Sequence, residues 1–153
     1  MKFLITGGAG FIGHNVVRQL EQQGHDCFIM DSCTDYGFIP RDELDYLLAE
    51  RKERMRSNIL HVDLRDYEKV KTFFLNFSYQ ADAVIHLASF PRQKIVNANP
   101  VVGAEIMCPA IMNLLELTKA FKIPKFVYIS SSMVYGDFAN DVKEDVVCTP
   151  QGQ

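Results

Sequence analysis

The feature that most constrains this chain is a set of glycines near its start. Gly7, Gly10 and Gly13 separate an apolar, strand-like segment from a helix-like one. In such a turn the first glycine permits a tight reversal, the second lets the backbone approach a phosphate, and the third lets helix and strand pack closely. The free N–H groups at the start of the helix attract an anion. A plain strand-to-helix turn is the alternative, but the position of the glycines favours a site for the pyrophosphate of a dinucleotide.

Strand-length apolar runs alternate with helix-period segments along the rest of the chain. This alternation predicts an α/β fold, with parallel strands joined by right-handed helical crossovers into a doubly wound sheet of order 3-2-1-4-5. Pro109 lies inside the last predicted helix, which it should kink or split. The predicted strands are Lys2–Thr6, Asp26–Met30, Asn58–Val62, Ala83–Leu87 and Lys125–Ile129. The predicted helices are Phe11–Gln23, Arg41–Arg56, Asp66–Phe77 and Val101–Phe121.

An acidic residue follows the second predicted strand. Asp31, with Ser32 beside it, stands where the carboxylate can accept both ribose hydroxyls of an adenosine. The same charge would repel a 2′-phosphate, so the position favours NAD over NADP. An aspartate that only stabilises the local turn is the alternative interpretation.

Charge and cysteine content exclude several classes of partner. A net charge of -3 gives no electrostatic reason to expect nucleic acid or an anionic membrane. The basic cluster Arg51–Arg56 follows an acidic helix start, which suits a solvated helix end. The four cysteines are widely spaced, so we expect no metal site or disulfide framework and a reducing compartment. No apolar run is expected to reach the length of a membrane span, and no signal peptide is expected, which together predict a cytoplasmic protein.

Four motifs, in a fixed order, carry a resemblance to a known family. They are Thr6-Gly-Gly-Ala-Gly-Phe-Ile-Gly13, His61-Val-Asp-Leu-Arg-Asp66, Ala83-Val-Ile-His-Leu-Ala88 and Ser130-Ser-Ser-Met-Val-Tyr-Gly136. The chain resembles the extended short-chain dehydrogenase/reductase superfamily, and more narrowly its NAD-dependent nucleotide-sugar epimerases and dehydratases, over essentially its whole length. The resemblance implies a Rossmann-like fold truncated after about the fifth strand. Residues 1–153 would then be an incomplete NAD-binding domain without the C-terminal substrate domain.

The resemblance also implies a set of cofactor-binding residues. Asp63 and Leu64 would meet the adenine, with a helix N-cap as the alternative role for Asp63 or Asp66. The end of the fourth strand would line the cofactor, and His86 there would have a structural role. The implied residues are Gly7, Gly10, Phe11, Ile12, Gly13, Asp31, Ser32, Asp63, Leu64, Leu87, Ala88 and Ser89.

Ser131 is the catalytic serine that the resemblance implies, and its hydroxyl would hydrogen-bond the sugar oxygen at the carbon that exchanges a hydride. A serine that only satisfies backbone groups at a strand end is the alternative. In the family the acid–base residue belongs to a Tyr-x-x-x-Lys helix further along the chain. Of the six tyrosines in residues 1–153, only Tyr67 is followed four positions later by a lysine, Lys71, and this pair comes before Ser131 in the chain, not after it.

Three functions therefore stay open. The first is the NAD-binding portion of a nucleotide-sugar epimerase or dehydratase, which acts by transient hydride transfer between a sugar carbon and NAD and is nearly inactive on its own. The others are a non-catalytic NAD- or nucleotide-binding module and an interaction protein with a vestigial cofactor turn. Decarboxylase and reductase members share these features, and epimerase is preferred as the commonest. An uncovered fifth strand and last helix predict a homo-oligomer.

Overall fold

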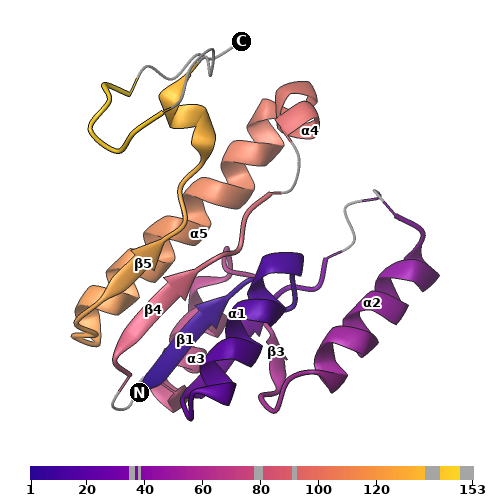
Figure 1. The fold of residues 1–153 in the computed structure, drawn as a ribbon, viewed down its shortest axis with the longest axis vertical. Coiled ribbons are helices and arrows are strands. Elements are labelled where there is room, and N and C mark those ends of the chain that lie inside the picture. The colour runs from indigo at the N-terminus through magenta and orange to yellow at the C-terminus, as the bar shows by residue number, and fades with distance from the viewer. Residues whose placement is uncertain (35–36, 38, 78–80, 91–92, 137–141, 149–153) are drawn as a thin grey trace.

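One parallel sheet organises the molecule. The computed structural model describes residues 1–34, 37, 39–77, 81–90, 93–136 and 142–148. Five strands lie in the order β3-β2-β1-β4-β5 (Figure 1). This arrangement confirms the predicted doubly wound, Rossmann-like sheet. The strands are β1 (Lys2–Thr6), β2 (Asp26–Asp31), β3 (Ile59–His61), β4 (Ala83–His86) and β5 (Phe126–Tyr128).

The helices cross between the strands and begin and end close to the predicted positions. The short α4 and the 3-10 helix η1 were not predicted, and the predicted ends of the third, fourth and fifth strands extend beyond the observed pairing. The helices are α1 (Phe11–Gln22), α2 (Arg41–Glu53), α3 (Tyr67–Phe77), α4 (Gln93–Ala98), α5 (Pro100–Ala120) and η1 (Ser132–Tyr135).

Two apolar layers hold the sheet. On one face, side chains of α3 and α5 pack on the inner strands, and Phe74, Leu114 and Leu117 are almost fully buried there. On the other face Val17 of α1 packs against Ile5 and its neighbours. Figure 1 shows α1 on the near side of the sheet and α5 on the far side. The carboxyl ends of β1, β2 and β4 therefore meet at one edge, where ligands of such sheets bind.

Pro109 does not divide the last long helix. α5 runs without interruption from Pro100 to Ala120. Of the predicted kink or split, the split is therefore wrong, and the kink stays a prediction. A proline removes one hydrogen bond from a helix interior, but the neighbouring Ala110 and Leu114 are buried against the sheet and stabilise the helix around it.

The apolar character of α5 also exceeds the prediction. By length and composition alone this helix could cross a membrane, with a mean hydropathy of 1.4 and 28% of the apolar window buried. The expectation that no apolar run reaches that length is therefore wrong. Leu114 and Leu117 face the core, so packing against the sheet accounts for part of the apolar composition of α5.

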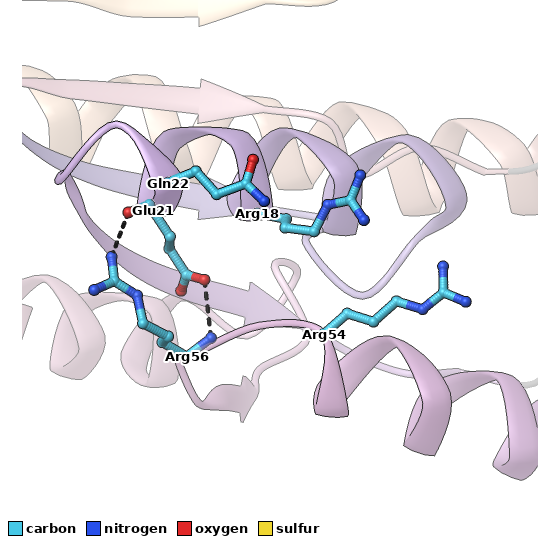
Figure 2. A pocket seen from close by; sticks show the side chains of 5 residues that line it. All are labelled: Arg18, Glu21, Gln22, Arg54 and Arg56. Atoms are coloured by element: carbon cyan, nitrogen blue, oxygen red, sulfur yellow. Dashed lines mark hydrogen bonds between the residues drawn. The ribbon is translucent and has the colours of Figure 1, made fainter.

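Glu21 at the end of α1 fixes the chain between α2 and β3. Its carboxylate accepts hydrogen bonds from the Arg56 amide (2.8 Å), the Ser57 amide (2.7 Å) and the Ser57 hydroxyl (2.6 Å). The Arg56 guanidinium donates to the Glu21 carbonyl, and Figure 2 shows both Arg56 contacts. These contacts explain why α2 ends at Glu53 rather than at the predicted Arg56, and why the basic cluster is not simply a solvated helix end.

Glu21→Gln is expected to lower the free energy of unfolding by about 1.5–3 kcal/mol, because a neutral amide replaces a charged acceptor of several bonds. Burial opposes ionisation of Glu21, but the Ser57 hydroxyl, the two backbone amides and the Arg56 charge outweigh it and lower its pKa. The contribution is therefore present above the ordinary pKa of 4.5 and is lost as pH falls through the lower native value. Urea unfolding from pH 7 to pH 3 measures both effects. Glu50→Gln, in an exposed pair with Arg54, is the control that should change stability little; an equal loss in both variants would contradict this account.

Candidate cofactor-binding site

The glycine turn leaves no room for side chains at its first and third positions. Gly7 has φ +71°, and a Cβ there would lie 2.5 Å from the Ala88 nitrogen. A Cβ on Gly13 would lie 2.0 Å from the Gly7 carbonyl oxygen. The Gly10 amide donates to that same oxygen over 3.1 Å. The predicted tight turn and close helix packing are thus both present, and the phosphate contacts stay predictions.

The start of α1 is open. Gly10 is its N-cap, and among the described residues no side-chain hydrogen bond caps this end. The side chains of Phe11 and Ile12 are 76% and 60% exposed. The first N–H groups of a helix have no acceptor within it and carry partial positive charge. This geometry suits an anion that approaches over Phe11 and Ile12.

Asp31 ends β2 and points back at the glycine turn. One carboxylate oxygen accepts the Ala9 amide over 3.0 Å, and the other accepts the Cys33 amide over 2.8 Å. The bond to Cys33 is the local turn of the alternative interpretation. The contact of Asp31 with a ribose stays a prediction. A carboxylate has about four lone-pair sites, so Asp31 can still accept a further hydrogen bond. Ser32 is half-buried beside it.

Cys33 lies against this carboxylate with φ 49°. Burial, the Asp31 charge and a hydrogen bond to Asp31 raise the pKa of the Cys33 thiol to about 12. The thiol therefore stays neutral at pH 7.

The residues expected to meet the adenine, Asp63 and Leu64, both have contacts within the protein. The Asp63 carboxylate is bound by the Arg65 guanidinium, with a closest distance of 2.6 Å. Hydrogen bonds from Arg65 outweigh burial and lower the pKa of Asp63. Asp66, not Asp63, accepts the Lys69 amide at the start of α3 and so takes the helix-capping role. Leu64 is buried in the core, and only its backbone can serve a ligand.

The end of β4 is fastened to β1 by a residue that sequence reasoning missed. The Thr6 hydroxyl lies 2.7 Å from His86 Nδ1 and accepts the Ala88 amide over 3.3 Å. Burial lowers the pKa of His86, so the ring is neutral at pH 7, and its tautomer sets whether Nδ1 or the Thr6 hydroxyl donates. This agrees with a structural role for His86. Beyond it, Leu87 and Ala88 are half-buried and Ser89 is exposed.

Ser131 caps η1. Its hydroxyl accepts the Met133 amide over 3.2 Å, and the side chain is exposed. The alternative of a serine that satisfies a backbone group is thus realised, and the catalytic role of Ser131 stays a prediction. Among the described residues, no three His, Cys, Asp or Glu side chains are grouped as metal ligands.

Arg51 is a second residue that sequence reasoning missed, because its basic cluster predicts only a solvated helix end. Its guanidinium donates to the Ala9 carbonyl in the glycine turn over 2.8 Å. The partners are far apart in sequence, and only the path of α2 brings them together. The only signal in the sequence was the basic cluster, and its pattern does not indicate which of its side chains contacts the glycine turn.

Comparison with known proteins places these features in a family. The model of the NAD dependent epimerase/dehydratase family matches residues 3–152. Protein CapI of Staphylococcus aureus is 35% identical, over 89% of this chain and 39% of its own. The UDP-glucuronate 4-epimerase of Thermodesulfobacterium geofontis is 32% identical, over 97% of this chain and 46% of its own. The solved complex of Thermus thermophilus UDP-glucose 4-epimerase with NAD has a TM-score of 0.77 and 28% identity, over 98% of this chain and 45% of its own. The chain thus spans less than half the length of these three proteins.

Proposed function

The chain belongs to the NAD dependent epimerase/dehydratase family, and on this premise we propose that it is the NAD-binding portion of a nucleotide-sugar epimerase or dehydratase. The observation that carries the proposal is the glycine turn, where a Cβ on Gly7 or Gly13 would meet backbone atoms. Such a cradle, at an uncapped helix start, fits a pyrophosphate. Asp31 beside it fits the adenosine ribose.

The remaining cofactor contacts follow the edge of the sheet. Asp63 would meet the adenine once its carboxylate is shared between Arg65 and the ligand. Leu87, Ala88 and Ser89 would line the cofactor beyond the end of β4. When bound, NAD supplies the hydride acceptor that oxidises a sugar carbon to a transient keto sugar.

For the whole protein we propose a nucleotide sugar as substrate, with epimerisation preferred over dehydration, decarboxylation or reduction. The UDP-sugar epimerases among the similar proteins support this preference. Ser131 would hydrogen-bond the reacting sugar oxygen. The one Tyr-x-x-x-Lys segment in residues 1–153, Tyr67 to Lys71, comes before Ser131 and so does not match the order that the resemblance implies. We therefore assign the proton transfer to none of these tyrosines. The reading frame beyond Gln153 tests this part: a Tyr-x-x-x-Lys segment soon after supports it, and a stop codon contradicts it.

A non-catalytic NAD-binding module is the second candidate. Calorimetric titration with NAD tests the feature that both candidates share. Heat of binding and a thermal shift support them. If the protein shows no response at millimolar NAD, both candidates fail. The remaining hypothesis is then an interaction protein whose glycine turn is vestigial.

Asp31→Asn is expected to weaken NAD binding about 10- to 100-fold, since a hydrogen bond to a charged group contributes about 1.5–3 kcal/mol. The preference for NAD over NADP should also fall, because the charge that repels a 2′-phosphate is gone. Calorimetry with both dinucleotides measures the two effects. Asp26→Asn, at the exposed opposite end of β2, is the matched control. Equal affinities of the Asp31 variant and the control would remove Asp31 from the site.

We also propose that the chain forms a homo-oligomer. On β5 and just after it, Val127, Tyr128 and Ile129 are 43%, 59% and 50% exposed. On α5, Met112 and Leu115 are exposed as well. Exposed strand edges and apolar patches promote association. Light scattering at increasing concentration should give masses above that of a 17.4 kDa monomer; a constant monomer mass would contradict the proposal.

A cytoplasmic location completes the proposal. Cys27, Cys33, Cys108 and Cys148 are all free thiols. Free cysteines suit a reducing compartment.

A further inference from the structure

α2 lies at one side of the molecule (Figure 1). None of the residues of α2, all of which the structure describes, is buried. Leu44, Leu47 and Leu48 are only half-buried. A helix with so little burial needs specific polar contacts to hold its place, because apolar packing supplies most helix stability in proteins.

Arg51 supplies one such contact, and it reaches the cofactor turn. Its guanidinium donates to the carbonyl of Ala9, a residue that is 2% exposed. The amide of Ala9 donates to Asp31 on the other side. Two charged side chains thus hold the two polar groups of one residue. Hydrogen bonds to charged groups are shorter and stronger than neutral ones.

The peptide unit that Arg51 holds lies at the start of the proposed anion site. Ala9 contributes its carbonyl, and Gly10 contributes its N–H, which donates to Gly7 over 3.1 Å. Gly10 is also the N-cap of α1. Fixing this peptide plane therefore fixes the direction from which the first N–H groups of α1 are presented. The guanidinium also adds a positive charge near the helix start, where the helix dipole already favours an anion.

We propose that Arg51 is a cofactor-positioning residue, through which α2 holds the glycine turn in the form that accepts a pyrophosphate. The inference rests on the proposed function of NAD binding. Three other arginines of this region are engaged elsewhere. Arg41 pairs with Asp45, Arg54 pairs with Glu50, and Arg56 binds Glu21. A lysine at position 51 would offer a compact ammonium in place of the planar guanidinium.

The affinity test uses Arg51→Gln, Arg51→Lys and the control Arg54→Gln. Arg54 lies one turn further along, and Figure 2 shows it extended beside Arg18. Calorimetry with NAD, ADP, NADP and adenosine is carried out on each protein. If Arg51→Gln leaves the turn competent about 10–30% of the time, NAD and ADP affinities fall about 3- to 10-fold. Adenosine, which has no phosphate, should bind unchanged. Arg51→Lys should recover part of the loss, and Arg54→Gln should match the wild type.

A second readout follows the contact without any ligand. In the free protein, Arg51→Gln should shift the NMR amide signal of Gly10, whose peptide unit includes the Ala9 carbonyl. Amide hydrogen exchange over residues 7–13 should also quicken. Arg54→Gln should change neither.

The outcomes separate the two proposals. If the wild type binds no NAD, the proposed function and the cofactor role of Arg51 both fail. If the wild type binds NAD and Arg51→Gln binds it equally well, only the role of Arg51 fails. A loss confined to NADP would make Arg51 a reader of the 2′-phosphate and would overturn the positioning role. An equal loss for adenosine and ADP would overturn it too, because the defect would then be general.

Discussion

Gly13→Ala is expected to weaken NAD binding at least about 100-fold and to lower the free energy of unfolding by about 1–3 kcal/mol, the usual range for overpacking. Intrinsic helix propensity predicts the opposite sign, because alanine is favoured over glycine by about 1 kcal/mol inside a helix. Sterics decide the outcome. The new Cβ would lie 2.0 Å from the Gly7 oxygen and 2.7 Å from the Gly8 Cα. Both are backbone atoms, so relief requires the turn itself to move.

Gly24→Ala is the control for Gly13→Ala. Gly24 has φ +80°, but among the described residues no atom lies within 4 Å of a Cβ built there. Its substitution should cost about 1 kcal/mol of backbone strain and leave NAD affinity unchanged. Calorimetry for binding and urea unfolding for stability compare the two variants. A Gly13 variant that binds NAD like the wild type would show that α1 can move away from β1 without loss of the site.

The sheet was predictable because its order follows from local patterns and one rule of handedness. Each strand is an apolar run of its own, and right-handed crossovers leave few ways to order the five. The elements that were missed carry no such pattern. α4 and η1 are too short to show a period, and β3 is cut short because only Ile59–His61 pair with β2. The continuity of α5 through Pro109 depends on packing against the sheet, which a local rule does not contain.

The candidate site was predictable where its residues lie close together in sequence or at the ends of neighbouring strands. The glycines and Asp31 lie at the ends of neighbouring strands, so their convergence follows from the topology. Thr6 and Arg51 act on partners brought close only by the finished fold, namely His86 and Ala9. The motif around Asp63 predicts a carboxylate open to a ligand, and spacing alone does not reveal its ion pair with Arg65.

Thr6→Val should be strongly destabilising even though it conserves the shape of the side chain. Valine has nearly the same shape and a good strand propensity, so packing and local structure are kept. The lost hydroxyl leaves the Ala88 amide and His86 Nδ1 without their partner in a fully buried position. Each buried polar group left unpaired costs about 1–3 kcal/mol. The free energy of unfolding should therefore fall by about 2–4 kcal/mol, and NAD binding should weaken because Ala88 packs against Gly7.

Two companion variants test whether the loss of stability comes from the hydroxyl, and a pH series tests the burial of His86. Thr6→Ser keeps the oxygen and should recover most of the stability, whereas Thr72→Val, exposed on α3, should change little. Burial lowers the pKa of His86, so its contribution is complete above the ordinary value of 6.5 and is lost as pH falls below it. Valine at position 6 keeps the burial of the ring, so the wild type and Thr6→Val should both lose stability as pH falls below 6.5. A Thr6→Val profile that stays flat below pH 6.5 would contradict burial as the cause of the lowered pKa.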